Sequence, residues 1–250
     1  MNTLVTLGCS LTKGVGSWGD RTKKEKDWLK LHNDIRDPEN VKRFNEFGWP
    51  NLVGKELGFD KVINLAQDGA SNSGQLKHFM ETDLPIKNTY VIWMLTEPLR
   101  FSFYRGGKIC DLNPVVENNF TESYLNFIQD STLDGYKEEL FYINCLREIC
   151  ENRGYKLILT YWSRISRYTQ TLDTNKSNWL FSNPKELFPT NSNQISNVCN
   201  HPNEKGYEWI ASEIINGVKT NHIDFIVNNP KKSIIYESVD YKLSTRTLLL

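Results

Sequence analysis

The chain has 250 residues, a length that favours one domain over two. It carries 30 lysines and arginines against 30 aspartates and glutamates, and this balance argues against a protein whose main partner is a polyanion such as a nucleic acid. Aromatic residues make up 12% of the sequence, and seven of them are tryptophans, so a sizeable core can form.

The cysteines and the apolar runs suggest a cellular compartment. The five cysteines are widely spread and include no Cys-x-x-Cys pair, so neither a zinc ribbon nor a disulfide framework is indicated. No run approaches the roughly 20 apolar residues of a membrane span, and the N-terminus lacks the pattern of a signal peptide. We therefore expect a cytoplasmic protein without a membrane span, a metal site or a cofactor.

The predicted elements alternate along the chain. In chain order the patterns predict a strand at 4–7, a helix at 49–57, a strand at 61–65, a helix at 73–80, a strand at 90–95, a helix at 133–152, a strand at 156–161 and a helix at 207–218. Each strand is a compact apolar run rather than an alternating one, which is typical of strands buried on both faces of a parallel sheet. The sequence therefore predicts an α/β fold, a three-layer α/β/α sandwich with a mostly parallel central sheet.

Three segments fall outside this alternation. Residues 22–47 are charged and polar, and we expect a surface excursion there. Residues 163–200 are rich in Asn, Ser and Thr but carry three large aromatic side chains, which is typical of a lid or a wall of a substrate site, or of a locally disordered loop. Residues 220–250 either add a strand through 233–237, dock on a partner, or form a loosely attached tail. The predicted division is a domain at 1–220, with insertions at about 20–47 and 163–200, and a C-terminal extension at 221–250.

Ser10 and His201 form the candidate catalytic pair. Ser10 follows the first predicted strand in Gly-Cys-Ser-Leu-Thr, and His201 opens His-Pro-Asn-Glu-Lys-Gly just before the last predicted helix. A serine hydroxyl is too weakly acidic to attack an ester unaided and needs an adjacent base, usually histidine. Both residues are expected at the carboxyl edge of the sheet, where open α/β folds bind ligands. The alternatives are a helix N-cap for Ser10 and an ordinary loop histidine for His201.

Two further strand ends are expected at the same edge. Gly69 follows the second predicted strand, and glycine lets the backbone approach a substrate closely. The backbone N–H groups of Ser10, or its neighbour, and of Gly69 could then stabilise a tetrahedral oxyanion. Glu97 and Arg100 follow the third strand and could pair across the edge of the site.

Four segments, 8–12, 64–72, 94–97 and 201–206, resemble in order the four sequence blocks of the SGNH (GDSL-type) hydrolases. The resemblance covers about residues 4–218. It implies a serine esterase or acyl-hydrolase in which Ser10 is the nucleophile, His201 the base, and Gly69 a donor to the oxyanion hole, with Thr96 in place of the family's asparagine donor. It also implies a small ester or an O-acetylated sugar as substrate.

The chain departs from the family before its histidine. Where the family has aspartate three residues earlier, this chain has Val198, and the nearest polar side chains are Asn197 and Asn200. An amide oxygen can hold the imidazole tautomer but does not stabilise imidazolium as a carboxylate does. The alternatives are a Ser–His dyad, a slow enzyme, or a carboxylate supplied from elsewhere, by Asp173 or Glu204.

Other interpretations also remain open at this stage. Cys9 stands where the family has aspartate and is an alternative nucleophile, although its side chain is expected to point away from that of Ser10. Residues 14–19 match a dinucleotide-binding fingerprint, but they begin several residues after the strand, so a glycine-rich loop beside Ser10 is favoured. The alternative functions are a catalytically weakened domain that binds a ligand or a protein, and a sugar O-acyltransferase.

Overall fold

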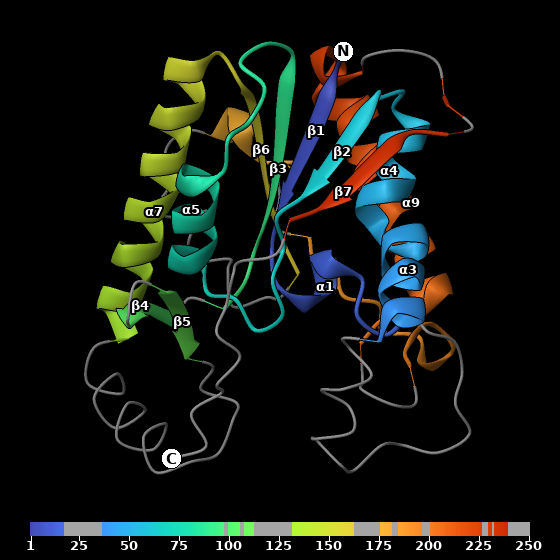
Figure 1. Ribbon diagram of the computed structural model, residues 1–250, viewed down its shortest axis with the longest axis horizontal. Coiled ribbons are helices and arrows are strands. Elements are labelled where there is room, and N and C mark those ends of the chain that lie inside the picture. Colours follow the sequence, from blue (N-terminus) through green and yellow to red (C-terminus); the bar gives the residue numbers. More distant parts are fainter. Residues whose placement is uncertain are drawn as a thin grey trace.

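A computed structural model describes residues 1–17, 37–97, 100–105, 108–112, 132–162, 176–181, 185–196, 201–226, 230–231 and 233–239. Five strands form one parallel sheet in the order β6-β3-β1-β2-β7, and helices cover both of its faces (Figure 1). The predicted three-layer α/β sandwich with a parallel sheet is therefore confirmed.

The central strands lie where the apolar runs predicted them. Their bounds are β1 Thr3–Leu7, β2 Lys61–Asn64, β3 Thr89–Leu95, β6 Lys156–Tyr161 and β7 Ile235–Ser238. In the register of the sheet, Leu7 of β1 pairs with Trp93 of β3, and Thr6 pairs with Asn64 of β2. The carboxyl ends of the three middle strands therefore meet at one edge.

Two apolar layers enclose the sheet because successive side chains of a strand point to opposite faces. Leu4, Val62 and Ile92 pack against α4 (Trp49–Glu56) and α9 (Glu204–Asn221). Their strand neighbours Val5, Ile63 and Val91 pack against α5 (Asn72–Glu81) and α7 (Thr132–Arg153). Figure 1 shows α5 and α7 on one side of the sheet and α3, α4 and α9 on the other.

The last third of the expected surface excursion at 22–47 forms a helix, α3 (Pro38–Phe47). Asp37 caps this helix by accepting hydrogen bonds from the N–H groups of Glu39 and Asn40. Pro38 occupies the first helical position, where no N–H is needed, and Phe44 is buried. The cap and the proline were visible in the sequence. Residues 18–36 lie outside the described residues.

A second sheet, absent from the sequence-based prediction, consists of the antiparallel strands β4 (Phe101–Arg105) and β5 (Lys108–Leu112). The two residues between them are both glycine, and a Gly-Gly pair between two short strand-forming runs is a known hairpin signal. This signal could have revealed the hairpin.

The remaining segments are partly described. Residues 235–238 of the C-terminal segment form β7 and extend the sheet beside β2, which is the added strand among the three alternatives. Within 163–200, the turns η2 (Lys176–Asn178) and η3 (Ser192–Gln194) are described, and Trp179 is buried and bridged to Leu159 of β6. Residues 163–175, 182–184 and 197–200 lie outside the described residues, so the lid remains a prediction.

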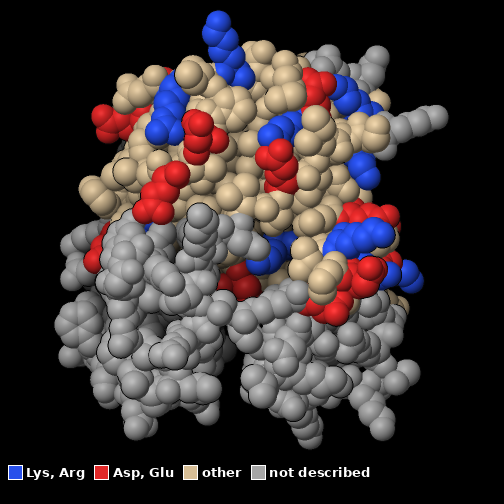
Figure 2. Space-filling view, viewed as in Figure 1, with Lys and Arg blue, Asp and Glu red and all other residues tan. Residues whose placement is uncertain are grey.

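Two short elements complete the fold, α1 (Ser10–Lys13) and η4 (Ile223–Phe225). Among the helices that the structure describes, none combines the length and apolarity needed to cross a membrane. Acidic and basic side chains are interspersed over the described surface in Figure 2.

Candidate active site

Ser10 is the first residue of α1, directly beyond the end of β1. Cys9 occupies the N-cap position without a side-chain capping bond, so the N-cap interpretation of Ser10 is wrong. Gly8 allows this sharp entry into the helix, because a Cβ at that position would lie 1.9 Å from Oγ1 of Thr12. Cys9 itself is fully buried in the apolar layer that includes Trp49.

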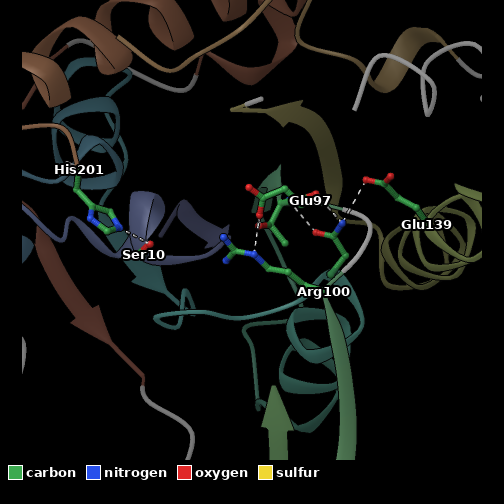
Figure 3. A network of polar contacts seen from close by, with 7 residues as sticks. Ser10, Glu97, Arg100, Glu139 and His201 are labelled. Atoms are coloured by element: carbon green, nitrogen blue, oxygen red, sulfur yellow. Dashed lines mark hydrogen bonds and ion pairs between the residues drawn. The ribbon is translucent and has the colours of Figure 1, made fainter. Parts of the chain in front are cut away.

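The structure brings Ser10 and His201 together. Nε2 of His201 lies 2.8 Å from Oγ of Ser10, although 191 residues separate them in the sequence (Figure 3). This distance is within the range required of a nucleophile and its general base. Ser10 is 6% exposed, so the pair lies at a shielded point of the carboxyl edge.

A glycine loop after α1 determines where His201 lies. Gly16 has φ +103°, and a Cβ there would lie 2.8 Å from Cβ of His201 and 2.6 Å from the carbonyl oxygen of Pro202. Only a glycine fits this approach without displacing the histidine backbone. The carbonyl of Val15 accepts a 2.7 Å hydrogen bond from the hydroxyl of Tyr207 in α9. The loop expected beside Ser10 therefore also supports the histidine, a role that the sequence analysis missed.

The chain around His201 is fixed from its other side by backbone hydrogen bonds. The N–H of Ser196 donates to the carbonyl of His201 at 2.7 Å, and Asn203 caps α9 by accepting from the N–H of Gly206 at 3.1 Å. The N–H of Asn203 in turn donates to the carbonyl of Gln194 at 2.9 Å. The backbone of this segment is thus fixed to the start of α9, whose inner face is buried.

Two backbone donors border the serine. Among the described residues, the N–H groups of Ser10 and Gly69 take part in no hydrogen bond. The N–H of Gln67 donates to the carbonyl of Gly8 at 3.2 Å, which holds the turn after β2 against the turn after β1. Gly69 has φ +72°, and nothing lies within 4 Å of the place where its Cβ would be. The arrangement leaves both donors available to a ligand.

Thr96, after β3, is held by an asparagine that the sequence analysis did not single out. The side chain of Asn72 accepts from the Thr96 N–H at 2.9 Å and donates to its carbonyl at 3.1 Å. The same amide also donates to the buried carboxylate of Glu139 at 3.2 Å. Oγ1 of Thr96 donates a long bond of 3.4 Å to Glu97. The only signal for Asn72 in the sequence is its position at the start of a predicted helix.

One ion pair and one buried phenol lie near this edge. The predicted Glu97–Arg100 pair is confirmed, with Oε2 of Glu97 2.6 Å from Nε of Arg100. At the end of β6, burial raises the pKa of Tyr161 to about 12, so its phenol stays protonated at neutral pH. No group of three or more potential metal ligands is found among the described residues.

Most of the residues predicted to orient His201 lie outside the described part of the chain. Asp173, Asn197, Val198 and Asn200 lie outside the described residues, so the predicted roles of the asparagines remain predictions. Glu204, the other candidate carboxylate, is the first residue of α9 and pairs with the guanidinium of Arg43 from α3. The Glu204 carboxylate is therefore paired with Arg43 in this structure, and no hydrogen bond or ion pair between it and His201 is found among the described residues.

Among solved structures, the chain is similar to an acetyl xylan esterase from the rumen bacterium Butyrivibrio proteoclasticus. The TM-score is 0.54, with 14% sequence identity over 90% of this chain and 65% of that chain. The two proteins share a fold. A family two carbohydrate esterase from Clostridium thermocellum also matches, with a TM-score of 0.39 and 10% identity over 90% of this chain and 64% of that chain. The chain thus spans slightly less than two thirds of either structure, and it matches no protein-family model and no curated protein.

Proposed function

We propose that the protein is a serine esterase or acyl-hydrolase of the SGNH type that cleaves a small ester or an O-acetyl group. The observation that carries the proposal is the 2.8 Å contact between Nε2 of His201 and Oγ of Ser10 at the carboxyl edge of a parallel sheet. An esterase-like fold and the unpaired donors beside Ser10 support the same reaction class.

The proposed reaction has two steps. Oγ of Ser10 attacks the acyl carbonyl carbon while Nε2 of His201 takes the hydroxyl proton. The tetrahedral oxyanion accepts hydrogen bonds from the N–H groups of Ser10 and Gly69, and from the Thr96 hydroxyl once it turns away from Glu97. Removal of one such donor typically costs about 2.7–4 kcal/mol. The C–O bond to the alcohol then breaks, and His201 returns the proton to the leaving oxygen. Water, deprotonated by His201, releases the acyl group from Ser10.

The substrate class rests on the fold and on the sequence motifs. The similar structure with the higher TM-score is an acetyl xylan esterase by name, so an acylated carbohydrate is our leading candidate.

Position 198 is valine where the family has aspartate, so we propose that the proton transfer is performed by a Ser–His dyad, or by a pair oriented by the amides of Asn197 or Asn200. A weaker catalyst than a full triad is expected in that case.

The test is hydrolysis of p-nitrophenyl acetate by the wild type, Ser10→Ala and His201→Ala. Each variant should lose about 10³-fold or more in kcat, because either substitution removes a member of one reacting unit. Two matched controls should retain wild-type rates. Ser212→Ala changes an exposed residue of α9, and His222→Gln changes the residue that follows the C-terminal end of α9. A fluorophosphonate probe should add to the intact mass of the wild type but not to that of Ser10→Ala.

Two outcomes would contradict the proposal. Unchanged turnover in Ser10→Ala would exclude the serine mechanism. A folded wild type that neither turns over nor takes up the probe would favour a domain that binds a ligand or protein without catalysis.

A further inference from the structure

Two nitrogens of a buried guanidinium near the candidate active site have no hydrogen-bond acceptor among the described residues. The side chain of Arg100 is 8% exposed. Among the described residues, neither its Nε nor its Nη1 has a hydrogen-bond partner. Oε2 of Glu97 lies 2.6 Å from Nε but off the direction of the N–H bond, so this contact is an ion pair without a formed hydrogen bond. Buried donors left unpaired are rare and costly, and a ligand that supplies the acceptors accounts for them.

The strand register places this arginine at the edge that carries the nucleophile. Leu7, the last residue of β1, pairs with Trp93 of β3, so Ser10, which opens the helix after β1, and Thr96, which follows β3, both lie just beyond the carboxyl ends of neighbouring strands. The N–H of Arg100 donates to the carbonyl of Glu97 at 3.2 Å, which turns the chain back just beyond Thr96. In Figure 3 the guanidinium extends from the β3 side toward Ser10.

His201 and Arg100 lie on opposite sides of Ser10 in Figure 3. His201 must return its proton to the leaving oxygen, so the alcohol part of an ester is bound on the histidine side. The acyl chain then extends to the other side, toward Arg100. A guanidinium presents several N–H donors in one plane and matches the two oxygens of a carboxylate, and such charge-assisted bonds are stronger than neutral ones.

We infer that Arg100 binds a carboxylate at the far end of the substrate's acyl group, so that the preferred substrates are half-esters of dicarboxylic acids. This inference rests on the proposed esterase function. Glu97 balances the charge of Arg100 in the free protein, and the substrate carboxylate supplies acceptors for the guanidinium N–H groups that have none among the described residues.

The experiment compares two esters of equal chain length, the mono-p-nitrophenyl ester of glutaric acid and neutral p-nitrophenyl valerate. The rate measured with Ser10→Ala is subtracted from each, because the free carboxylate accelerates spontaneous hydrolysis. The wild type should favour the glutarate ester in kcat/KM by about tenfold or more, the size expected of a charge-assisted hydrogen bond. Arg100→Gln should remove this preference, and Arg100→Lys should retain part of it.

The matched control is Lys219→Gln. Lys219 lies in the last turn of α9 and pairs with Glu56 of α4. It is roughly 22 Å along the helix axis from the start of α9 beside His201. Removing this positive charge should leave the rates on both esters unchanged. Circular dichroism and thermal unfolding establish whether each arginine variant is folded.

The outcomes separate the two proposals. If Ser10-dependent hydrolysis is found but the wild type does not prefer the glutarate ester, the assignment of Arg100 is overturned while the esterase function stands. If folded Arg100→Gln still prefers the glutarate ester, the assignment of Arg100 is also overturned. If neither arginine variant folds, the assignment is judged by whether the wild type prefers the glutarate ester. Loss of all Ser10-dependent turnover, on both esters and on p-nitrophenyl acetate, overturns the proposed function itself.

Discussion

At the scale of single residues, the proposed oxyanion hole depends on a backbone conformation that favours glycine. Gly69 has φ +72°, a left-handed value that costs an ordinary residue roughly 1–2 kcal/mol. No atom lies within 4 Å of the missing Cβ, so a methyl group there would meet no steric obstacle. A substitution at Gly69 is therefore expected to act by changing the φ angle of residue 69, which sets the direction of its backbone N–H.

Gly69→Ala should lower kcat on p-nitrophenyl acetate by about tenfold or more, because a backbone donor to the oxyanion is displaced. The unfolding free energy should fall by about 1 kcal/mol. Gly154→Ala is the matched control, since Gly154 has φ +68°, equally open surroundings and a position just after α7. It should lose similar stability and keep kcat. Equal kcat losses in both variants would refute a specific role for Gly69.

The sequence could indicate the Ser10–His201 pair, which the structure brings into contact, but not the residues that hold the two in place. Ser10 and His201 stand in recognisable local contexts, one after a strand and one before a helix. Gly16 lies against His201, and Asn72 is hydrogen-bonded to Thr96. Both contacts depend on distances between segments that are remote in the chain. No local pattern encodes those distances.

At the scale of elements, one buried asparagine joins α1, the helix that begins at Ser10, to the sheet. The amide of Asn64, at the end of β2, donates to the carbonyl of Thr12 in α1 at 3.1 Å and to the hydroxyl of Tyr236 in β7 at 2.8 Å. Its oxygen accepts from Oγ1 of Thr6 and from the N–H of Ala66, each at 3.1 Å. All four hydrogen-bonding positions of this amide are thus filled.

Asn64→Ala should destabilise the fold by about 2–4 kcal/mol, because several buried partners lose their bonds together. It should also lower kcat, since α1 loses one of its attachments to the sheet. Tyr236→Phe removes one of the four bonds and should cost about 0.5–1.5 kcal/mol without an effect on kcat. Urea unfolding and ester hydrolysis measure both quantities. Full activity in Asn64→Ala would show that α1 is positioned without this amide.

The elements themselves were predictable to different degrees. The strands β1, β3 and β6 are buried over nearly their whole length and consist largely of apolar residues, and these runs were recognised within one residue of their observed bounds. The edge strand β7 alternates between exposed and half-buried residues, and its partner β2 lies about 170 residues earlier, so the sequence left three alternatives. Local hydrophobicity cannot identify a partner that far away.

At the scale of the whole molecule, the proposed catalytic pair and a stabilising ion pair lie at opposite edges of the sheet. Asp60 precedes β2, and its carboxylate accepts from the N–H of Asn2 at 2.7 Å and pairs with Lys231. It therefore joins the start of β1 to the chain that leads into β7. The hydrogen bond from Lys231, followed by the Asn2 N–H, holds the pKa of Asp60 below its ordinary value of 3.8.

A carboxyl whose pKa is lowered by folding stabilises the folded state above its unfolded pKa, and this contribution disappears as the pH falls through the folded pKa. The wild type should therefore lose stability as the pH falls below about 4. Asp60→Asn should lose up to about 1 kcal/mol at pH 7, because the group is partly exposed to solvent, and should show a weaker acid dependence. Denaturant unfolding from pH 7 to pH 3 measures both effects, with Asp224→Asn as a control for removing a surface carboxylate beside a lysine. Ester hydrolysis at pH 7 should not change in Asp60→Asn, because the substitution lies at the amino edge. A loss of kcat matching that of Gly69→Ala would mean that the two edges are coupled.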